Sequence, residues 1–186
     1  MVRAFISVDF TDKSIKEKIK DLQDEISSSG AHLRIVNPSN LHITLEFLGD
    51  ITEDQVAVLK EILEELEFDL IKLNVKNPNV LPNENHIRVI YCELDGDIEP
   101  LKEIQKILRE KLRTNGFRVD NRSFKPHLTI ARVKSAKNRK ELIRVIKQQS
   151  KVSCGIQEIN TINLKKSILK PEGPQYTKLH EIQARK

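Results

Sequence analysis

Two short stretches with the same order of residue types contain the side chains best suited to chemistry. The first is LHITL, which includes His42 and Thr44, and the second is PHLTI, which includes His127 and Thr129. In an extended strand alternate side chains point to one face, so each stretch would place its histidine and threonine together, opposite its aliphatic residues. If the two strands lie side by side, two imidazoles and two hydroxyls converge on one site.

The two histidines could form an acid–base pair, because an imidazole with a pKa of about 6.5 can accept or donate a proton near neutrality. A pair in opposite protonation states can take a proton from an attacking water and give one to a leaving oxygen. This suits in-line displacement at phosphorus, and no metal is needed when the phosphate is a strained cyclic diester with a ribose hydroxyl as leaving group. Thr44 and Thr129 would hold the non-bridging phosphate oxygens through neutral hydrogen bonds.

A metal site is the main chemical alternative, since histidine is a common ligand. Glu46 shares the parity of His42 in an ideal strand and could be a further ligand. A metal would need a third or fourth ligand, and neither motif brings a nearby Cys, Asp or second His at useful spacing. One His-x-Thr stretch would be weak evidence, but two copies at matching places favour the paired site.

The elements around the motifs follow nearly the same order in both halves of the chain. Hydrophobic periodicity and turn residues predict a strand, a helix, a short strand, the motif strand, a helix and a further strand, with a break near residues 77–85. The predicted ranges are strand 3–10, helix 12–28, strand 32–36, motif strand 41–48, helix 52–66 and strand 68–75, followed by strand 86–94, helix 97–115, strand 117–119, motif strand 126–133, helix 138–149 and strands 152–158, 162–169 and 176–183. The repeated order predicts two similar lobes.

The composition is typical of a globular protein with a heavily charged surface. The chain has 186 residues, enough for one domain or two small lobes that share a cleft, with 38% hydrophobic and 32% charged residues. Aromatic residues make up only 4%, so the core must consist mostly of Ile, Leu and Val. The net charge of +5 and the pI near 9.1 are compatible with a polyanionic partner.

The cysteines and the apolar segments bear on the cellular compartment. Cys92 and Cys154 lack CxxC spacing and are expected to be free structural thiols in a reducing compartment, with a single disulfide as the alternative. No apolar run approaches the ~18–20 residues of a membrane span. The opening MVRAFISVDF lacks the features of a signal peptide. We therefore expect a cytoplasmic protein that does not bind membranes.

The motifs and their flanks resemble those of the two-histidine (2H) phosphoesterase superfamily. Residues 40–49 (NLHITLEFLG) resemble the first motif block of the RNA 2′,3′-cyclic phosphodiesterases, also called 2′-5′ RNA ligases, and residues 124–132 (FKPHLTIAR) resemble the second. The opening residues 3–9, and the closing residues 167–169 and 173–176, are also similar to the ends of that family. The resemblance covers essentially the whole chain.

The resemblance implies an α+β, bilobal fold in which each lobe has a mostly antiparallel sheet with helices on its outer side. The lobes would be related by a pseudo-two-fold axis, with the active site in the cleft between them. Residues 1–186 would form one 2H phosphoesterase domain of two interleaved lobes, each contributing one His-x-Thr motif. No cofactor and no metal are implied.

The implied activity is hydrolysis of RNA 2′,3′-cyclic phosphate ends to 2′-phosphate ends. By the resemblance His42 is the proton donor to the leaving ribose O3′ and His127 is the proton acceptor that activates water. The motifs themselves are nearly symmetric and do not distinguish the two roles. RNA with 2′,3′-cyclic phosphate ends is the expected partner, with tRNA halves as one candidate, and a monomer is expected.

Three further residues are candidates for substrate binding. Arg132 lies five residues after His127, so strict alternation puts it on the opposite face unless the strand bulges or twists there. If it does, Arg132 could contact phosphate or stack on a base; otherwise it is a surface arginine. Phe5 and Tyr176 could each offer a base a stacking surface, and each could equally be part of the core.

Other functions compatible with the motifs stay open. The same site run in reverse would join RNA ends through a 2′-5′ linkage. A nucleotide- or RNA-binding module with little turnover is a further alternative, although both histidines and both threonines are present. Action on a small cyclic nucleotide is another. Lysine-rich residues 134–140 and 165–170 could follow an RNA backbone or form ordinary solvated surface.

Overall fold

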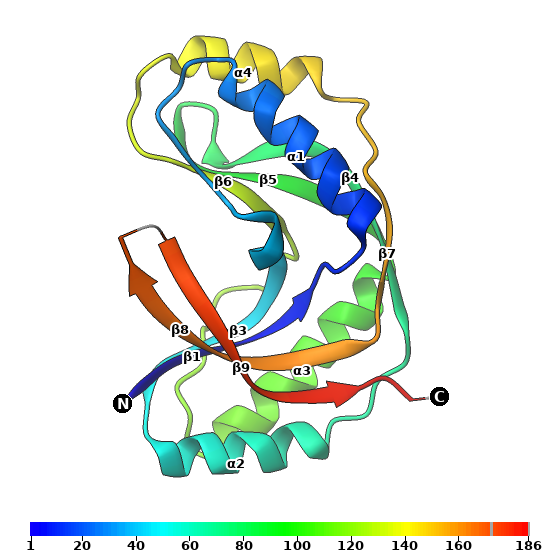
Figure 1. Ribbon diagram of the computed structural model, residues 1–186. Coiled ribbons are helices and arrows are strands. Elements are labelled where there is room, and N and C mark those ends of the chain that lie inside the picture. Colours follow the sequence, from blue (N-terminus) through cyan, green and yellow to red (C-terminus); the bar gives the residue numbers. More distant parts are fainter. Residues whose placement is uncertain (172, 186) are drawn as a thin grey trace.

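The computed structural model, which describes residues 1–171 and 173–185, is an α+β fold built on two antiparallel sheets (Figure 1). The first sheet has the strand order β3-β1-β8-β9 and the second has the order β2-β6-β5-β4-β7. The strands are β1 (Val2–Asp9), β2 (Leu33–Ile35), β3 (His42–Ile51), β4 (Ile71–Asn83), β5 (His86–Gly96), β6 (Leu128–Val133), β7 (Gly155–Ile159), β8 (Thr161–Lys170) and β9 (Gly173–Gln183). The predicted fold class is confirmed.

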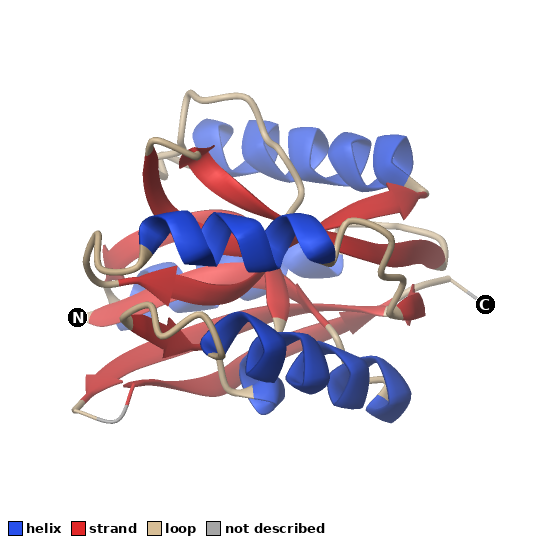
Figure 2. Cartoon of the chain, turned by 90° about the horizontal axis from the view of Figure 1, so that it is seen from above, coloured by secondary structure: helices blue, strands red, loops and turns tan. Residues whose placement is uncertain are grey.

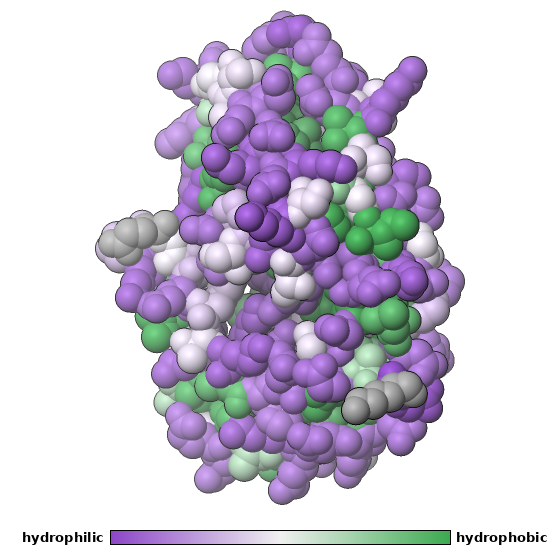
Figure 3. Space-filling view, turned by 45° about the vertical axis from the view of Figure 1, so that its right-hand side comes forward, coloured by the Kyte–Doolittle hydropathy of each residue, from purple (hydrophilic) through white to green (hydrophobic). Residues whose placement is uncertain are grey.

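Four α-helices cover the outer sides of the sheets, and Figure 2 shows these layers from above. Each helix buries an apolar stripe at helical spacing; in α1 the stripe includes Ile15, Ile19, Leu22 and Ile26. The face of the molecule in Figure 3 is largely hydrophilic, with apolar residues in separate patches. The helices are α1 (Lys13–Ser27), α2 (Glu53–Glu64), α3 (Ile98–Thr114) and α4 (Arg139–Gln148), and a 3-10 turn, η1, spans Pro38–Asn40.

The helices cross between the two halves. α1 follows β1 of the first sheet but packs against β6 and β7 of the second sheet and against α4. α3 follows β5 of the second sheet and contacts β4 there, but it also packs against β3 of the first sheet and against α2. The motif strands β3 and β6 also contact each other, although they belong to different sheets. The exchange of helices and the contact between β3 and β6 bring the two motifs to the junction of the sheets.

Each motif strand contains a β-bulge one residue after its threonine. The pairing of β3 with β1 skips Leu45, directly after Thr44, and the pairing of β6 with β5 skips Ile130 in the same place. An extra residue reverses the alternation of the side chains that follow it. As a result Phe47 and Arg132, each five residues after its histidine, return to the histidine face.

A buried glutamine from the helix packed on each sheet binds the bulge. Gln23 of α1 donates from Nε2 to the carbonyls of Ile130 and Val36, each at 2.8 Å. Gln105 of α3 donates from Nε2 to the carbonyl of Leu45 at 3.3 Å. Buried carbonyls need such donors, so these two polar residues belong on otherwise apolar helix faces.

Two local predictions differ from the structure. The break predicted near 77–85 is too long, since β4 continues through Pro78 to Asn83. Proline is tolerated there because the register with β5 shifts next to it and β7 pairs only with residues 71–75 of β4, which leaves an open edge. The strand predicted at 117–119 is wrong, because this segment pairs with no strand.

The structure also bears on the cysteines and on membrane-spanning segments. Cys92 and Cys154 are free and buried, as predicted. In the part of the chain that the structure describes, no helix combines the length and the apolar character required to cross a bilayer.

Candidate active site at the junction of the sheets

The two motif histidines are held in the same way. His42 Nδ1 donates to the carbonyl of Asn40 at 2.6 Å, and His127 Nδ1 donates to the carbonyl of Lys125 at 2.7 Å. A carbonyl can only accept, so Nδ1 carries a proton in both rings, and Nε2 is the nitrogen that can gain or lose one. Each imidazole is therefore oriented and fixed in one tautomer by the backbone two residues before it.

The predicted alternation around each histidine is present. His42, Thr44, His127 and Thr129 are half-buried, whereas the aliphatic residues between and after them are buried in the core. The structure therefore places the four side chains on the faces expected, on two strands that contact each other.

Aromatic side chains enclose His42. The ring centroids of Phe5 and Tyr176 lie 5.1 Å and 5.3 Å from its own, and Tyr176 presents an edge-to-face arrangement at 89°. Burial lowers the pKa of His42 below its usual 6.5, and the hydrogen bond to Asn40 opposes this change. Arg132, from the other sheet, is among the cations that lower this pKa further, so the two halves meet at this ring.

A partly buried ion pair lies beside His42. Lys165 Nζ is 2.5 Å from Asp9 Oδ1, and their side chains are only 9% and 18% exposed. Asp9 also accepts from Asn163 Nδ2 at 3.2 Å and from Ser7 Oγ at 3.3 Å. The two charges act on His42 in opposite senses, because Asp9 raises its pKa and Lys165 lowers it.

The surroundings of His127 are more open. Its hydrogen bond is exposed, and its aromatic neighbour is Tyr91, with ring centroids 5.7 Å apart. Burial raises the pKa of the Tyr91 hydroxyl, and the nearby Glu93 carboxylate raises it further. Glu93 accepts from the side-chain amides of Asn77 at 3.0 Å and Asn79 at 2.6 Å, so neutral donors hold this carboxylate.

Arg132 lies on the histidine face because of the bulge at Ile130. Its charge acts on both His42 and Tyr176. In β2 the residue opposite Arg132 is Arg34, whose guanidinium lies against Gly173, where an added Cβ would come within 3.3 Å of Nη2. The sequence required a bulge or twist for Arg132 to reach the histidine face, and the strand has that bulge. Arg34 is a neighbour that the sequence alone did not identify.

The aromatic candidates differ in the surface they present. Phe5 is 4% exposed and packs against His42 and Tyr176, so it supports these rings and has little surface left for a base. Tyr176 is half-buried, and Phe47 is 66% exposed with its ring centroid 6.3 Å from that of Phe5. Around His42, Tyr176 and Phe47 are therefore the rings with exposed surface for stacking.

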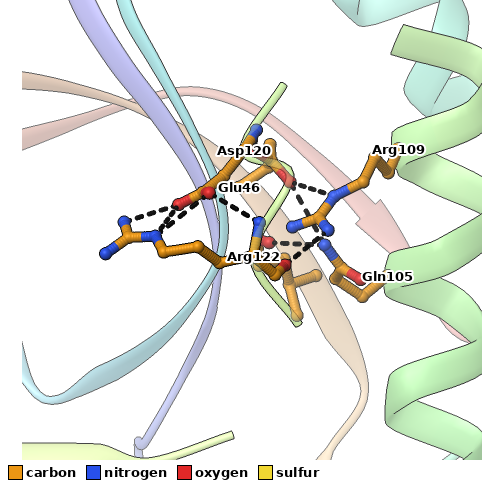
Figure 4. Close-up of polar contacts among 6 residues, drawn as sticks. Glu46, Gln105, Arg109, Asp120 and Arg122 are labelled. Carbon is orange, nitrogen blue, oxygen red and sulfur yellow. Dashed lines mark hydrogen bonds and ion pairs between the residues drawn. The ribbon is translucent and has the colours of Figure 1, made fainter. Parts of the chain in front are cut away.

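Glu46 points away from the histidines, which contradicts the hypothesis that it joins His42 as a metal ligand. The bulge at Leu45 turns it toward α3, where it is 2% exposed. Its carboxylate accepts from Arg109 Nε at 3.0 Å and from Gln105 Nε2 at 3.1 Å (Figure 4). Within residues 1–171 and 173–185, no three or more His, Cys, Asp or Glu side chains gather where they could hold a metal ion.

The same carboxylate connects the first motif strand to the segment before the second. Glu46 Oε1 accepts from the backbone N–H of Asp120 at 2.8 Å, and Arg109 Nη1 donates to the carbonyl of Arg122 at 2.9 Å (Figure 4). Residues 120–122 lead directly to the strand of His127. The contacts of Glu46 therefore help to fix the approach of the second motif.

The residues that sequence reasoning missed share a cause. Arg34, Lys165 and Asp9 come from strands distant from the motifs, and only the sheet register brings them together. Gln23 and Gln105 give a local signal, because each is a polar residue within the apolar stripe of its helix.

The chain is similar to several proteins of known name and to solved structures. Residues 4–183 match the family model described as the AKAP7 2′5′ RNA ligase-like domain. The chain is 39% identical over 181 residues to the RNA 2′,3′-cyclic phosphodiesterase of Methanocaldococcus jannaschii, an alignment that covers 97% of this chain and 99% of that one. It is 37% identical over 178 residues to the protein of the same name from Archaeoglobus fulgidus, covering 96% and 98% of the two chains.

A solved structure shares the fold. Escherichia coli LigT complexed with 3′-AMP superposes with a TM-score of 0.80 and 21% identity, covering 100% of this chain and 99% of that one. At this identity the likeness establishes the common architecture of two sheets with outer helices.

Proposed function

The chain belongs to the 2′-5′ RNA ligase-like family of the 2H phosphoesterases, and on that premise we propose that it is an RNA 2′,3′-cyclic phosphodiesterase. It opens the 2′,3′-cyclic phosphate at an RNA end to a 2′-phosphate and a free 3′-hydroxyl. The relatives at 37% and 39% identity, which carry the name RNA 2′,3′-cyclic phosphodiesterase, support this substrate class.

One observation carries the mechanism. Two imidazoles, each fixed through Nδ1 by a backbone carbonyl, lie on contacting strands with a threonine on the same face. His127 Nε2 takes a proton from water, whose oxygen attacks phosphorus. The bond from phosphorus to O3′ breaks on the opposite side, and protonated His42 Nε2 gives its proton to O3′. Thr44 and Thr129 donate to the non-bridging oxygens as charge builds there.

The lowered pKa of His42 is compatible with its role as proton donor only in the complex. In the free protein burial favours the neutral ring. An anionic phosphate beside it favours the charged form instead, so substrate binding raises the pKa of His42 toward the value that a donor needs. Substrate binding therefore favours protonation of His42, which then serves as the acid.

The proposal also covers metal independence, the RNA partner and the reverse, ligating reaction. Proton transfer between two imidazoles and neutral oxygen donors requires no metal or other cofactor. Attack by an RNA 5′-hydroxyl in place of water gives a 2′-5′ linkage, so ligation is a second, weaker activity of the same residues. The partner is RNA with a cyclic end, tRNA halves among the candidates, and the protein acts as a cytoplasmic monomer.

An oligonucleotide with a 2′,3′-cyclic phosphate end tests the proposal. With chelator present we expect a 2′-phosphate product, and His42→Ala and His127→Ala each lower the rate about 10²- to 10⁴-fold. His86→Ala, an exposed histidine outside the site, is the matched control and keeps full activity.

Each contrary outcome has a distinct meaning. Full activity in either motif variant would overturn the acid–base pair. Loss of activity with chelator alone would revive a metal mechanism. Tight binding of the cyclic end with no turnover by the unaltered chain would favour the nucleotide- or RNA-binding module.

A further inference from the structure

Arg34 and Arg132 form a pair of cations on neighbouring strands. They are direct partners in the antiparallel pairing of β2 and β6, so their side chains leave the same face of the sheet. Like charges directly opposite each other destabilise a sheet. None of the ion pairs in the described part of the chain includes either arginine. An anion placed between them would remove this repulsion.

The two arginines face different neighbours at the proposed site. The charge of Arg132 acts on both His42 and Tyr176. Arg34 acts on Tyr176 but is not among the described charges that act on His42. Its guanidinium lies at Gly173, at the start of β9 in the other sheet. Arg34 therefore extends the positive charge of Arg132 toward the start of β9.

An RNA end carries a second phosphate close to the one that reacts. The cyclic phosphate occupies the 2′ and 3′ oxygens of the last ribose, and the rest of the chain leaves through the phosphodiester on its 5′ oxygen. A free nucleoside 2′,3′-cyclic phosphate has no such group. Guanidinium forks bind phosphate oxygens in a bidentate manner, so a pair of arginines is suited to that phosphodiester.

We propose that Arg34, together with Arg132, binds the phosphodiester on the 5′ side of the terminal nucleotide, so that the site selects cyclic ends of RNA over free nucleoside 2′,3′-cyclic phosphates. The proposal deepens the function proposed above and rests on it. Arg34 is a specificity-determining residue in this arrangement, because it contacts a group that does not react.

Positive charge continues beyond the pair along the same chain. The exposed residues Lys134, Lys137, Arg139 and Lys140 follow Arg132 closely, and the backbone N–H of Lys134 donates to the carbonyl of His32, next to β2. A longer RNA would gain affinity from these cations without sequence or end specificity. The test therefore uses the shortest ligands that differ by a single 5′-phosphate.

Two substrates isolate the proposed contact: adenosine 2′,3′-cyclic phosphate with and without a 5′-phosphate, compared at one salt concentration. We expect kcat/KM to be roughly 10- to 100-fold higher with the 5′-phosphate, the range of a charge-assisted hydrogen-bonded pair. Arg34→Met reduces this ratio to near one, chiefly through KM, because the contacted phosphate does not react. Arg34→Lys, which keeps the charge but loses the fork, gives an intermediate ratio.

Matched controls separate the contact from general charge and from folding. Arg113→Met removes an exposed arginine from α3, away from both motifs, and keeps the ratio of the unaltered chain. Thermal unfolding verifies that the Arg34 variants fold. Binding of adenosine 2′-phosphate and adenosine 2′,5′-bisphosphate, measured by calorimetry, repeats the comparison with ligands that need no turnover.

The outcomes distinguish the two proposals. A ratio near one in the unaltered chain, or an unchanged ratio in Arg34→Met, overturns the subsite while turnover of cyclic ends still supports the proposed function. An equal loss with both substrates also overturns it, because Arg34 would then act on the reacting phosphate. If neither substrate is opened but the bisphosphate binds more tightly and Arg34→Met abolishes this preference, the subsite stands and the proposed activity fails.

Discussion

The two motif strands are built alike as far as the bulge and then differ. Four residues after the histidine, the first strand has Glu46 and the second has Ala131. Five residues after it, on the histidine face, the first has Phe47 and the second has Arg132. The same backbone device thus delivers an aromatic ring in one half and a guanidinium in the other. A nearly symmetric scaffold therefore supports a polarised site.

A carboxylate in each half repeats this difference, since Asp9 acts on His42 and Glu93 acts on Tyr91, the aromatic neighbour of His127. Asp9 is held by a buried lysine, Lys165, whereas Glu93 is held by the neutral amides of Asn77 and Asn79. His42 is enclosed by aromatic rings, and the hydrogen bond of His127 is exposed. Two chemically identical imidazoles are thereby given different surroundings, which an acid–base pair requires.

The largest expected effect concerns the threonines, whose contributions the comparison predicts to be unequal. Thr44→Val and Thr129→Val each remove a hydroxyl and keep the side-chain shape. Loss of one donor to a developing oxyanion lowers kcat about 10²- to 10³-fold, and the donor nearer the growing charge should account for more. Rates on an oligonucleotide with a cyclic end measure both.

Serine is the matched control for each threonine because it restores the hydroxyl. Recovery of most of the rate in Thr44→Ser and Thr129→Ser would assign the loss to the hydrogen bond. Equal losses in the two valine variants would contradict the polarised site, and rates within about twofold of the unaltered chain would remove the threonines from the mechanism.

The next largest effect is on the free energy of unfolding, and it concerns Glu46, whose counterpart in the second motif strand is Ala131. Glu46→Ala leaves Arg109 and the Asp120 N–H without their shared acceptor. Breaking such a buried pair from one side costs about 3 kcal/mol, and the segment that leads to His127 loosens. Urea denaturation measures the free energy of unfolding, and hydrogen exchange measures the Asp120 amide.

Asp120→Ala provides the control, since it removes the exposed ion pair with Arg122 but keeps the backbone donor to Glu46. It should leave the urea midpoint nearly unchanged. An equally small effect of Glu46→Ala would mean that the two strands are alike in this respect, and that the buried carboxylate does not stabilise the first half.

The sequence predicted the parts of the fold that depend on periodicity. The helices and the His-x-Thr alternation follow from local patterns of apolar residues, and the structure places them where expected. The bulges do not follow, because one unpaired residue in a strand changes no local pattern. For that reason strict alternation placed Glu46 beside His42 and left Arg132 conditional. The extent of the domain, 1–186, stays a prediction.

Contacts set by register were also beyond local reasoning. Arg34 meets Arg132 because β2 pairs with β6 of the other half, and Lys165 meets Asp9 because β8 lies beside β1. A repeated order of elements predicts two similar lobes, but it does not predict which strands pair with each other in each sheet. The strand expected at 117–119 illustrates this: its counterpart in the first half, β2, pairs with β6 at the edge of the second sheet, whereas residues 117–119 pair with no strand.

The smallest expected effect tests whether the Asp9–Lys165 pair sets the protonation of His42. Asp9→Asn removes an anion and should lower the pKa of His42 further, whereas Lys165→Met removes a cation and should raise it. The double variant should fall between the two. NMR titration of the His42 ring measures each pKa directly, and the His127 ring gives a reference in the other half.

The same shift predicts how stability depends on pH. Because burial lowers the pKa of His42 below 6.5 in the folded chain, the unfolded chain binds more protons as the pH falls below that value. The contribution of His42 to stability is thus complete above this pH and declines below it, and the decline should be shallower in Lys165→Met than in Asp9→Asn. If the two variants move the His42 titration in the same direction, the ion pair acts through packing alone, and the aromatic enclosure by Phe5 and Tyr176 is what distinguishes the two halves.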